Sequence, residues 1–383
     1  MNAKELMSIA TSYYNAQDYE NAQLAFLKII ESDPSNASAY TNLGICFFVQ
    51  NLLEEAAECY IAANKVNPNY ISALYNYAHL LLLQKNYKEG FFYYRSRYDE
   101  RIRGNKPGGV AYPPTQLQGN EELNGKTLYI SHEQGFGDTI NFIRYIPIFL
   151  QTGAKLICYV PESMNRLFTL NYPQVEFITP NSDITFDYNT PLLEAPYLFG
   201  TTYESIPFGE KYLHVDKKDL QNFKIKHSLD KSDKLKIGFN YQGSQGADAV
   251  KNRSIELALM LEYLEQIPHV RLYCLQYERS ESDDALLEEH GIPNLGKEIK
   301  DFYDTALLIE SMDIIISIDT SFLHLAGALG KKSFALLKFH PDWRWGLRDE
   351  RTNWYKNFTL IRQNKPNDWE GVLQNVVQRI QNG

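Results

Sequence analysis

A period of 34 residues runs through the first hundred residues of the chain. Large and small side chains recur in phase in three copies. Such a period indicates stacked units, none of which buries its apolar face alone. The middle copy has Tyr40, Leu43, Gly44, Phe47, Ala56, Tyr60, Ala63 and Pro68. The copy before it has Leu6, Ile9, Ala10, Tyr13, Ala22, Phe26, Ile29 and Pro34, and the copy after it has Leu74, Tyr77, Ala78, Leu81, Gly90, Tyr94 and Arg97.

This pattern resembles the tetratricopeptide repeat, in which each copy is a pair of antiparallel helices. The small residues would lie where two helices approach closely, and the aromatic residues would fill the space between pairs. The second helices should end at Asp33-Pro34 and Asn67-Pro68, because proline disfavours helix in the residue before it. Arg97 departs from the pattern, as terminal repeats often do. The resemblance implies a peptide-binding groove over residues 1–104. A structural or dimerising role, or an ordinary helical bundle, is the alternative.

Composition narrows the class of protein. A chain of 383 residues suggests two or three domains. Its net charge of −9 argues against nucleic-acid binding, which rests mainly on basic charge. No apolar run approaches the ~18 residues of a membrane span, and the first residues lack the apolar core of a signal peptide. The 4 cysteines are scattered without metal-ligand spacing, so we expect a reducing, cytoplasmic location.

The chain changes character after the repeats. Glycine and proline cluster over residues 105–125, which we interpret as a linker. Short apolar runs then alternate with helical stretches, which favours parallel sheets buried on both faces. We predict Rossmann-like lobes over 126–230 and 231–383. The expected strands are Thr127–Ser131, Lys155–Val160, Val175–Ile178, Leu235–Asn240, Val270–Leu275, Asp313–Ile318 and Ser333–Leu337.

A first candidate site directly follows the strand expected at Thr127–Ser131. It consists of Glu133, Gln134, Gly135, Gly137, Asp138 and Thr139, followed by an apolar helix. Glycines permit a tight turn and close approach of the backbone to a ligand. Asp138 is either a general base or only a helix cap.

Two further candidate sites follow the strands expected at Asp313–Ile318 and Leu235–Asn240. A helix starting at Thr320 would point free N–H groups beyond the strand, which is favourable for a diphosphate. Cations in the other loop would hold phosphate oxygens. The residues are Asp319, Thr320, Ser321 and His324 in one stretch, and Gly243, Lys251 and Arg253 in the other. Helix capping, a buried histidine and solvated cations are the alternative interpretations.

Together these stretches resemble the glycosyltransferase family 9-like domains of bacterial tetratricopeptide-repeat proteins, relatives of ADP-heptose:lipopolysaccharide heptosyltransferases. The motifs are Glu133-Gln134-Gly135-x-Gly137-Asp138-Thr139, Asn252-Arg253-Ser254, Asp319-Thr320-x-x-x-His324-Leu325-Ala326-Gly327-Ala328-x-Gly330, Asp342-Trp343-Arg344-Trp345 and Trp354-Tyr355. The resemblance implies a GT-B fold with two facing lobes and a last helix, suited by Asp368–Ile380, that crosses back to the first lobe.

The resemblance also implies a metal-independent, inverting hexosyl- or heptosyltransferase whose nucleotide-sugar donor is a substrate, with no cofactor. Asp138 would be the base, although Glu133 is a second acid nearby. Gln134, Gly135, Gly137 and Thr139 would form the acceptor-side loop. The donor side would comprise Thr320, Ser321, His324, Asp319, Arg253, Lys251, Gln276 and Gly243.

We expect the repeats to recruit a protein or peptide acceptor. Two alternatives remain open. One is a non-catalytic repeat scaffold with a degenerate transferase domain. The other is a related reaction on free nucleotide sugars, such as epimerisation, although a small substrate needs no peptide groove.

Overall fold

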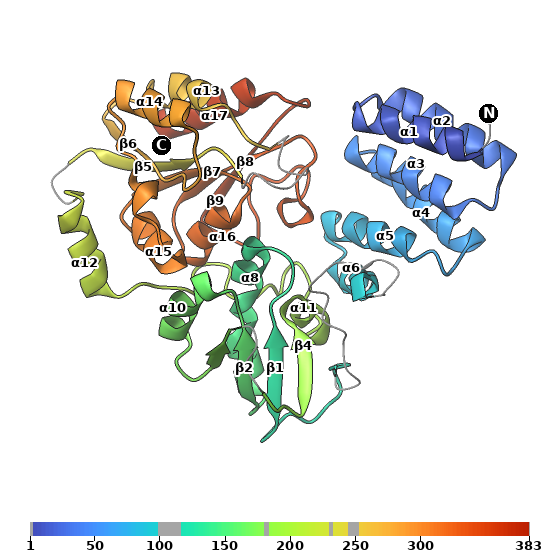
Figure 1. The fold of residues 1–383 in the computed structure, drawn as a ribbon, viewed down its shortest axis with the longest axis horizontal. Helices are drawn as coiled ribbons and strands as arrows, with labels where there is room; N and C mark the ends of the chain where they lie inside the picture. The colour runs from blue at the N-terminus through green and yellow to red at the C-terminus, as the bar shows by residue number, and fades with distance from the viewer. Residues whose placement is uncertain (1–2, 99–115, 180–183, 230–232, 244–252, 383) are drawn as a thin grey trace. The chain divides into compact units, whose positions relative to one another are not determined.

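The computed structural model describes residues 3–98, 116–179, 184–229, 233–243 and 253–382. The chain forms two compact units (Figure 1). The repeat unit consists of Met1–Ala111, Phe199–Ser205 and Asp342–Leu347. The α/β unit consists of Tyr112–Leu198, Ile206–Pro341 and Arg348–Gly383.

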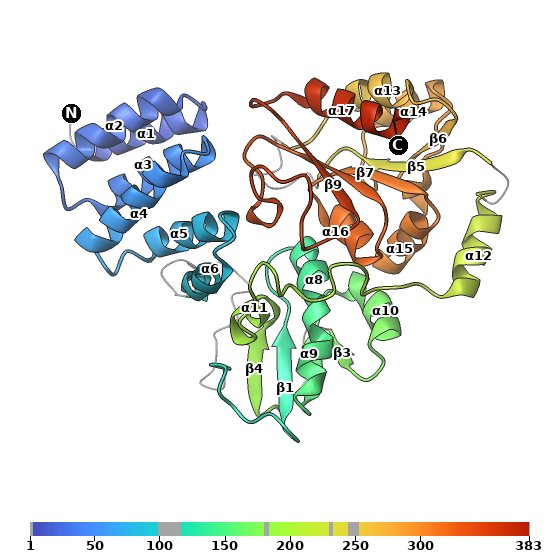
Figure 2. The same cartoon turned by 180° about the vertical axis from the view of Figure 1, so that it is seen from behind.

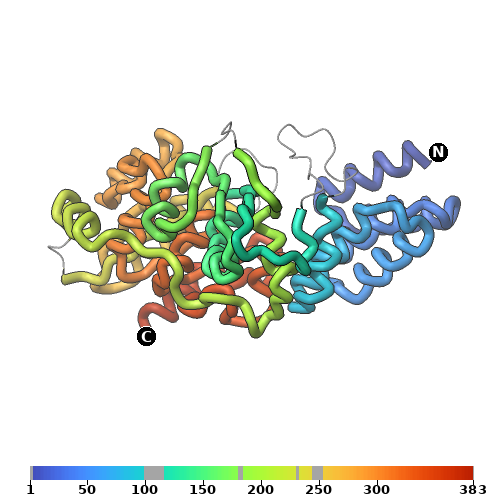
Figure 3. Tube along the Cα trace, turned by 90° about the horizontal axis from the view of Figure 1, so that it is seen from below, coloured from blue at the N-terminus to red at the C-terminus, as the bar shows by residue number. Residues whose placement is uncertain are grey.

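Within residues 3–98, the repeat unit contains three helix pairs, as its period predicts. Their helical turns can be followed along the blue part of the tube in Figure 3. The pairs are α1 (Ala3–Asn15) with α2 (Tyr19–Ser32), α3 (Ala37–Val49) with α4 (Leu53–Val66), and α5 (Ile71–Leu83) with α6 (Tyr87–Tyr94). The second helices α2 and α4 end just before Asp33 and Asn67, as the prolines predict. The period is also visible in the backbone. Gln17, Asn51 and Lys85, spaced 34 residues apart, make the turn within each pair with φ of 60°, 62° and 66°.

Close approach of helices explains the small residue in the middle copy. A Cβ atom added to Gly44 on α3 would lie 2.7 Å from the Tyr60 ring on α4. Tyr60 is 1% exposed, so its ring has little room to move. Ala10 and Ala78 occupy the same phase in the other two copies and are fully buried.

Segments distant in sequence complete the third copy. After α6, the 3₁₀ turn η1 (Arg95–Tyr98) buries Arg97, whose guanidinium lies 4.2 Å from the Tyr94 ring centroid. Trp343, in the 3₁₀ turn η6 (Trp343–Trp345), packs edge-on against Tyr87 and Phe91 of α6. The predicted repeat domain, residues 1–104, therefore lacks two segments that this compact unit includes.

We expect Gly44→Ala to destabilise the repeat unit by about 1–3 kcal/mol, because the added methyl group overpacks a rigid aromatic contact. Hydrogen exchange followed by mass spectrometry should show lost protection in peptides of α3 and α4. Peptides of the α/β unit are the internal control. Unchanged exchange in α3 and α4 would contradict the packing argument.

The first lobe of the α/β unit has a parallel sheet with strand order β3-β2-β1-β4. Its strands are β1 (Thr127–Ser131), β2 (Lys155–Tyr159), β3 (Glu176–Ile178) and β4 (Tyr188–Pro191). Its helices are α8 (Phe136–Phe142), η2 (Ile143–Tyr145), α9 (Ile146–Gln151), α10 (Glu162–Asn171), η3 (Leu192–Glu194) and α11 (Ala195–Leu198). The described end of the predicted linker is not free chain, because Gln116 pairs with Asn189 of β4.

The second lobe has a parallel sheet with strand order β6-β5-β7-β8-β9. Its strands are β5 (Leu235–Asn240), β6 (Val270–Cys274), β7 (Ile314–Ile318), β8 (Ser333–Leu337) and β9 (Phe358–Arg362). The helices around it are α12 (Lys217–Lys226), α13 (Leu257–Leu264), α14 (Glu281–Glu289), η5 (Leu295–Glu298), α15 (Phe302–Glu310), α16 (Ser321–Ala328) and α17 (Trp369–Gln381). Every residue of β7 is buried, as expected for a central parallel strand. The predicted helical solenoid followed by two parallel-sheet lobes is confirmed.

The last helix lies elsewhere than expected (Figure 2). The prediction that it crosses back to the first lobe was wrong. The buried face of α17, including Val372 and Val376, packs in the core of the second lobe with Ile237 and Phe239 of β5. The segment that returns to the first lobe contains Trp354 and Tyr355, whose side chains reach α8 and η2.

Candidate active site

The strand orders define where a ligand can bind. In the second sheet the order reverses between β5 and β7, and in the first sheet it reverses between β1 and β4. Open α/β sheets bind ligands beyond the carboxyl ends of their strands at such switch points. All three sequence motifs follow β1, β5 or β7, so the topology places them at these ends.

The loop after β1 turns at a glutamine. Gln134 is exposed and has a φ of 61°, whereas Gly135 has a φ of −95° that any residue can adopt. The expectation that the two glycines supply the tight turn is therefore wrong. A non-glycine residue in the left-handed region costs about 1 kcal/mol. Backbone strain of this kind clusters at functional sites.

Asp138 lies in the first turn of α8 and is half-buried. Its Oδ2 accepts a hydrogen bond of 3.1 Å from the backbone N–H of Gly135. The carboxylate is therefore held at the helix N-terminus, where negative charge is stabilised. Glu133, also half-buried, precedes the turn in the same loop. Both candidate bases thus lie at the carboxyl end of β1.

Thr139 has a structural contact. Its side chain is fully buried, and its Oγ1 lies 2.5 Å from Nδ1 of His132. Burial lowers the pKa of His132, while the nearby carboxylates of Asp138 and Glu133 oppose that shift. Thr139 therefore fixes the start of the loop against the start of α8, and the acceptor-side role of this loop stays a prediction.

Helix α16 begins with uncapped N–H groups. Its N-cap is Thr320, and the side chain of Thr320 makes no capping hydrogen bond to the first turn. Aspartates cap α15 and α17, whereas α10 and α13, like α16, have no capping hydrogen bond from the N-cap side chain. Free N–H groups at a helix N-terminus form a ready anion site. Thr320 and Ser321, both half-buried, add hydroxyl groups there.

Helices α8 and α16 pack against each other at these first turns (Figures 1 and 2). A Cβ added to Gly137 would lie 2.7 Å from His324 Cδ2 and 3.5 Å from Ser321 Cα. Gly137 is therefore required for contact between the lobes, and a close approach of its backbone to a ligand stays a prediction. The contact brings the loop of Asp138 beside the N-terminus of α16.

His324 is only 6% exposed. Its Nδ1 lies 2.9 Å from the hydroxyl oxygen of Tyr355, and its Nε2 lies 3.8 Å from Oδ1 of Asp319. The Tyr355 hydroxyl also accepts a hydrogen bond of 2.7 Å from Nδ2 of Asn141 on α8. His324 is thus part of a buried polar network that joins the two lobes.

The loop after β5 is organised by Gln276. This residue is 4% exposed, and its Oε1 accepts hydrogen bonds from Nδ2 of Asn240 (2.7 Å) and from the Gln242 backbone N–H (3.1 Å). Thr320 Oγ1 lies 3.5 Å from Asn240 Oδ1, which joins the β5 and β7 ends. Gln276 therefore supports this end of the sheet, and its place near a donor nucleotide stays a prediction.

The cationic loop is described in part, since Lys251 lies outside the described residues. Gly243 donates its backbone N–H to Oγ of Ser254 at 3.4 Å, and Glu256 is the N-cap of α13. Arg253 is half-buried, and its Nε has no hydrogen-bond partner among the described residues. Its guanidinium retains donor capacity for an anion.

Sequence reasoning did not identify several residues of this region. Glu194, 1% exposed, follows β4 at the switch point of the first sheet, but β4 itself was not predicted. Asn141 and Arg144 lie in the helical stretch after Asp138, where they look like ordinary polar positions. Tyr355 was identified only as part of a tail motif. These residues are recognised by their burial in the structure, because their spacing in the sequence gives no signal.

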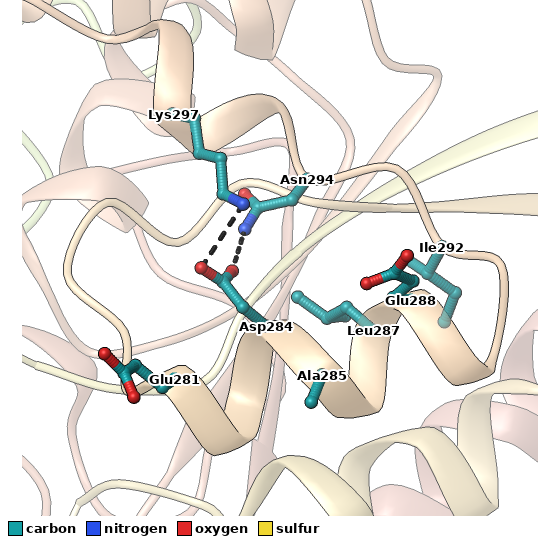
Figure 4. A pocket seen from close by; sticks show the side chains of 8 residues that line it. All are labelled: Glu281, Asp284, Ala285, Leu287, Glu288, Ile292, Asn294 and Lys297. Atoms are coloured by element: carbon teal, nitrogen blue, oxygen red, sulfur yellow. Dashed lines mark hydrogen bonds and ion pairs between the residues drawn. The ribbon is translucent and has the colours of Figure 1, made fainter.

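A pocket elsewhere has different chemistry (Figure 4). It has a volume of about 500 Å³ and is lined by Glu281, Asp284, Ala285, Leu287, Glu288, Ile292, Asn294 and Lys297. Its central carboxylate, Asp284, is already bound to Asn294 at 2.7 Å and Lys297 at 3.3 Å. This pocket contains none of the predicted site residues.

In the part of the chain that the structure describes, no three histidine, cysteine, aspartate or glutamate side chains are placed together to hold a metal ion. No helix in that part is long and apolar enough to cross a membrane.

Known proteins are similar to each of the two units. Residues 7–65 match the family model described as "Tetratricopeptide repeat". The crystal structure of the glycosyl transferase family 9 protein from Veillonella parvula DSM 2008 covers 68% of this chain and 97% of its own, with a TM-score of 0.51 and 11% identity. The chain therefore joins tetratricopeptide repeats to an α/β unit with the fold of that family 9 glycosyl transferase.

Two further proteins are similar. ADP-heptose lps heptosyltransferase II of E. coli is 12% identical, over 67% of this chain and 100% of its own, with a TM-score of 0.47. Protein FlbA of Caulobacter vibrioides is 24% identical over 411 residues, which cover 97% of this chain. The chain spans 66% of the length of FlbA.

We expect Gly137→Ala to destabilise the α/β unit, although helix propensity alone would make alanine more favourable by about 1 kcal/mol. The clash with His324 should outweigh that gain, with a net loss of about 1–3 kcal/mol in the free energy of unfolding. Denaturant titration measures the sign directly.

Gly135→Ala is the matched control in the same loop. The nearest atom to its added Cβ is Asp138 Oδ2 at 3.4 Å, an ordinary contact. Its unfolding free energy should therefore change by less than about 1 kcal/mol. Equal effects of the two substitutions would show that helix packing does not explain Gly137.

Proposed function

We propose that the chain is an inverting glycosyltransferase that transfers a sugar from a nucleotide-sugar donor to an acceptor recruited by the tetratricopeptide repeats. The observation that supports this most is the packing of α8 on α16. It puts a carboxylate loop at the end of β1 beside an uncapped helix N-terminus at the end of β7. Transfer from a nucleotide sugar needs a base for the acceptor and an anion site for the departing diphosphate, and these two features supply them.

The donor diphosphate would lie on the first turn of α16. The free N–H groups there, the hydroxyls of Thr320 and Ser321, and the Arg253 guanidinium would stabilise the negative charge that develops on the leaving group. Lys251 and Gly243 belong to the same proposed donor side. These donors would take the place of a metal ion, so we propose a metal-independent reaction with no cofactor.

Asp138 is the proposed base. It would accept the proton of an acceptor hydroxyl while that oxygen forms a bond to the anomeric carbon of the sugar. The bond from this carbon to the diphosphate oxygen breaks on the opposite face, so the configuration inverts and the nucleoside diphosphate leaves with the electron pair. Glu133 is the alternative base in the same loop.

The repeats would recruit a protein or peptide, because stacked helix pairs offer an extended concave surface.

The cysteines support a proposal that the protein acts in a reducing compartment such as the cytoplasm. All four are free, and Cys46, Cys158 and Cys274 are buried. Burial raises the pKa of the Cys274 thiol to about 11, so it stays protonated at neutral pH.

We expect Asp138→Asn to lower the transfer rate about 100-fold or more, because a positioned base contributes at least that much. Asparagine keeps the oxygen that accepts from the Gly135 N–H, so nucleoside diphosphate affinity and thermal stability should change little. A panel of nucleotide sugars, with release of nucleoside diphosphate as readout, measures the rate. Glu133→Gln, tested alongside, distinguishes the two candidate bases.

Asp283→Asn is the control for helix capping. Asp283 occupies the same position in the first turn of α14, where its Oδ2 accepts from the Ser280 N–H at 3.3 Å. Its replacement should leave transfer unchanged. No turnover and no nucleotide binding by the unsubstituted protein across the panel would contradict the enzyme proposal and favour a non-catalytic repeat scaffold.

We expect Gln134→Gly to weaken acceptor use without destabilising the protein. Gln17 is the matched control, since it is an exposed glutamine with nearly the same φ in the repeat unit. Glycine relieves about 1 kcal/mol of strain at either position but also loses more entropy on folding. Both variants should therefore keep their melting temperature. Only Gln134→Gly should raise the acceptor KM, and equal KM values would show that Gln134 only forms the turn.

A further inference from the structure

The loop that follows β6 carries an exposed aromatic ring on a buried base. Tyr277 is 61% exposed, whereas Gln276, directly before it, is 4% exposed. The chain therefore leaves the core of the second lobe at Gln276 and places the next side chain in solvent. A large aromatic side chain exposed beside a predicted ligand site is a candidate for contact with that ligand.

Arg279 fixes the backbone of this turn. Its guanidinium donates to the carbonyl oxygens of Gln276 and Tyr277, the latter at 2.8 Å. Its Nε donates to Oδ1 of Asp284 at 3.0 Å, and its side chain is only 6% exposed. A side chain at Gly296 of η5 would overlap the Gln276 carbonyl group, so η5 packs directly against the turn. The backbone is thus held in place while the ring remains accessible.

Tyr277 lies at the edge of the sheet where the donor site is proposed. Strands β6, β5 and β7 are neighbours and run parallel, so their carboxyl ends share one edge. The loop after β7 carries Thr320, the loop after β5 carries Arg253, and the loop after β6 carries Tyr277. The Gln276 amide oxygen joins the last two loops, because it accepts from the Gln242 backbone N–H.

The spacing of the strands fits one nucleotide along this edge. Neighbouring strands lie about 4.8 Å apart, so the loop after β6 is about 10 Å from the loop after β7. This is similar to the span from the diphosphate to the base in an extended nucleoside diphosphate. With the diphosphate on α16, the sugar to be transferred extends toward Asp138 in the first lobe. The nucleoside then extends the other way, past Arg253 toward Tyr277.

We propose that the nucleobase of the donor stacks on the ring of Tyr277. This inference rests on the proposed function, because the diphosphate on α16 determines where the base lies. An aromatic ring can stack on any base, since every base has a π-face. A ring on a rigid turn also loses little conformational freedom on binding. Tyr277 is thus a binding residue for the nucleoside half of the donor.

Calorimetric titration of the full chain with adenosine, guanosine, cytidine and uridine diphosphates tests this inference. We expect Tyr277→Ala to weaken binding of each diphosphate that the unsubstituted protein binds by about tenfold, the effect of one lost stacking contact. Tyr277→Phe keeps the ring and should retain the affinity. Inorganic diphosphate has no base, so its affinity should stay unchanged in both variants.

Tyr13→Ala is the matched control. Tyr13 is an exposed tyrosine of α1 in the repeat unit, with 38% of its surface accessible. Its replacement should leave the affinity for every probe unchanged. Both alanine variants should keep their melting temperature, because neither ring is buried.

Equal nucleoside diphosphate affinities of the unsubstituted protein and Tyr277→Ala would overturn the inference. An equal loss of inorganic diphosphate binding would overturn it as well, because the ring would then support the phosphate site and not the base. Failure of the unsubstituted protein to bind any of the probes would refute the proposed donor site together with the inference. Binding needs no turnover, so the expected Tyr277 effect in a protein without transfer activity would refute the proposed transfer alone.

Discussion

The packing of α8 on α16 is the contact on which the rest of the candidate site depends. Gly137 permits it, because any side chain at this position would overlap His324. Once the two helices touch, the loops that follow β1 and β7 are neighbours, and a carboxylate from one lobe lies beside the helix N-terminus of the other. A sheet by itself brings together only the ends of its own strands. Joining two sheets at their ends needs a close helix contact of this kind.

The contact is reinforced below the surface by groups that solvent does not reach. Arg144 is a buried cation held by backbone carbonyls and aromatic faces. Such a group is costly to bury unless every donor is used. If the carbonyl oxygens of Trp354 and Asn141 moved away, the positive charge of Arg144 would be buried without hydrogen-bond partners. The cost of that state holds both carbonyl oxygens in place. Tyr355 follows Trp354 in the chain, so its hydroxyl is held in place as well.

Much of this architecture could be predicted from sequence, and the exceptions have physical reasons. Strands such as β1, β5 and β8 were predicted to the residue, because buried parallel strands are continuous apolar runs. β4, Tyr-Asn-Thr-Pro, is short and polar and gives no such signal. The position of α17 in the sequence was predicted, but the lobe that it packs against was not. An apolar helix face does not indicate which sheet the helix covers. The roles of Gly137 and Gln276 depend on residues far away in the chain, and no local pattern contains them.

Two later segments of the chain, Phe199–Ser205 and Asp342–Leu347, belong to the repeat unit. This arrangement affects the order in which the protein can fold. Helices α1 to α6 are synthesised before any of the α/β unit, and domains generally begin to fold as they emerge from the ribosome. The aromatic face formed by Tyr87 and Phe91 is covered by Trp343, which is made some 250 residues later, as the difference between positions 91 and 343 shows. During synthesis Trp343 becomes available to this face only after strands β1 to β8 have been made. A chain cut between residues 99 and 115 would thus separate the repeats from a segment of their own core, so neither half is a natural fragment for expression.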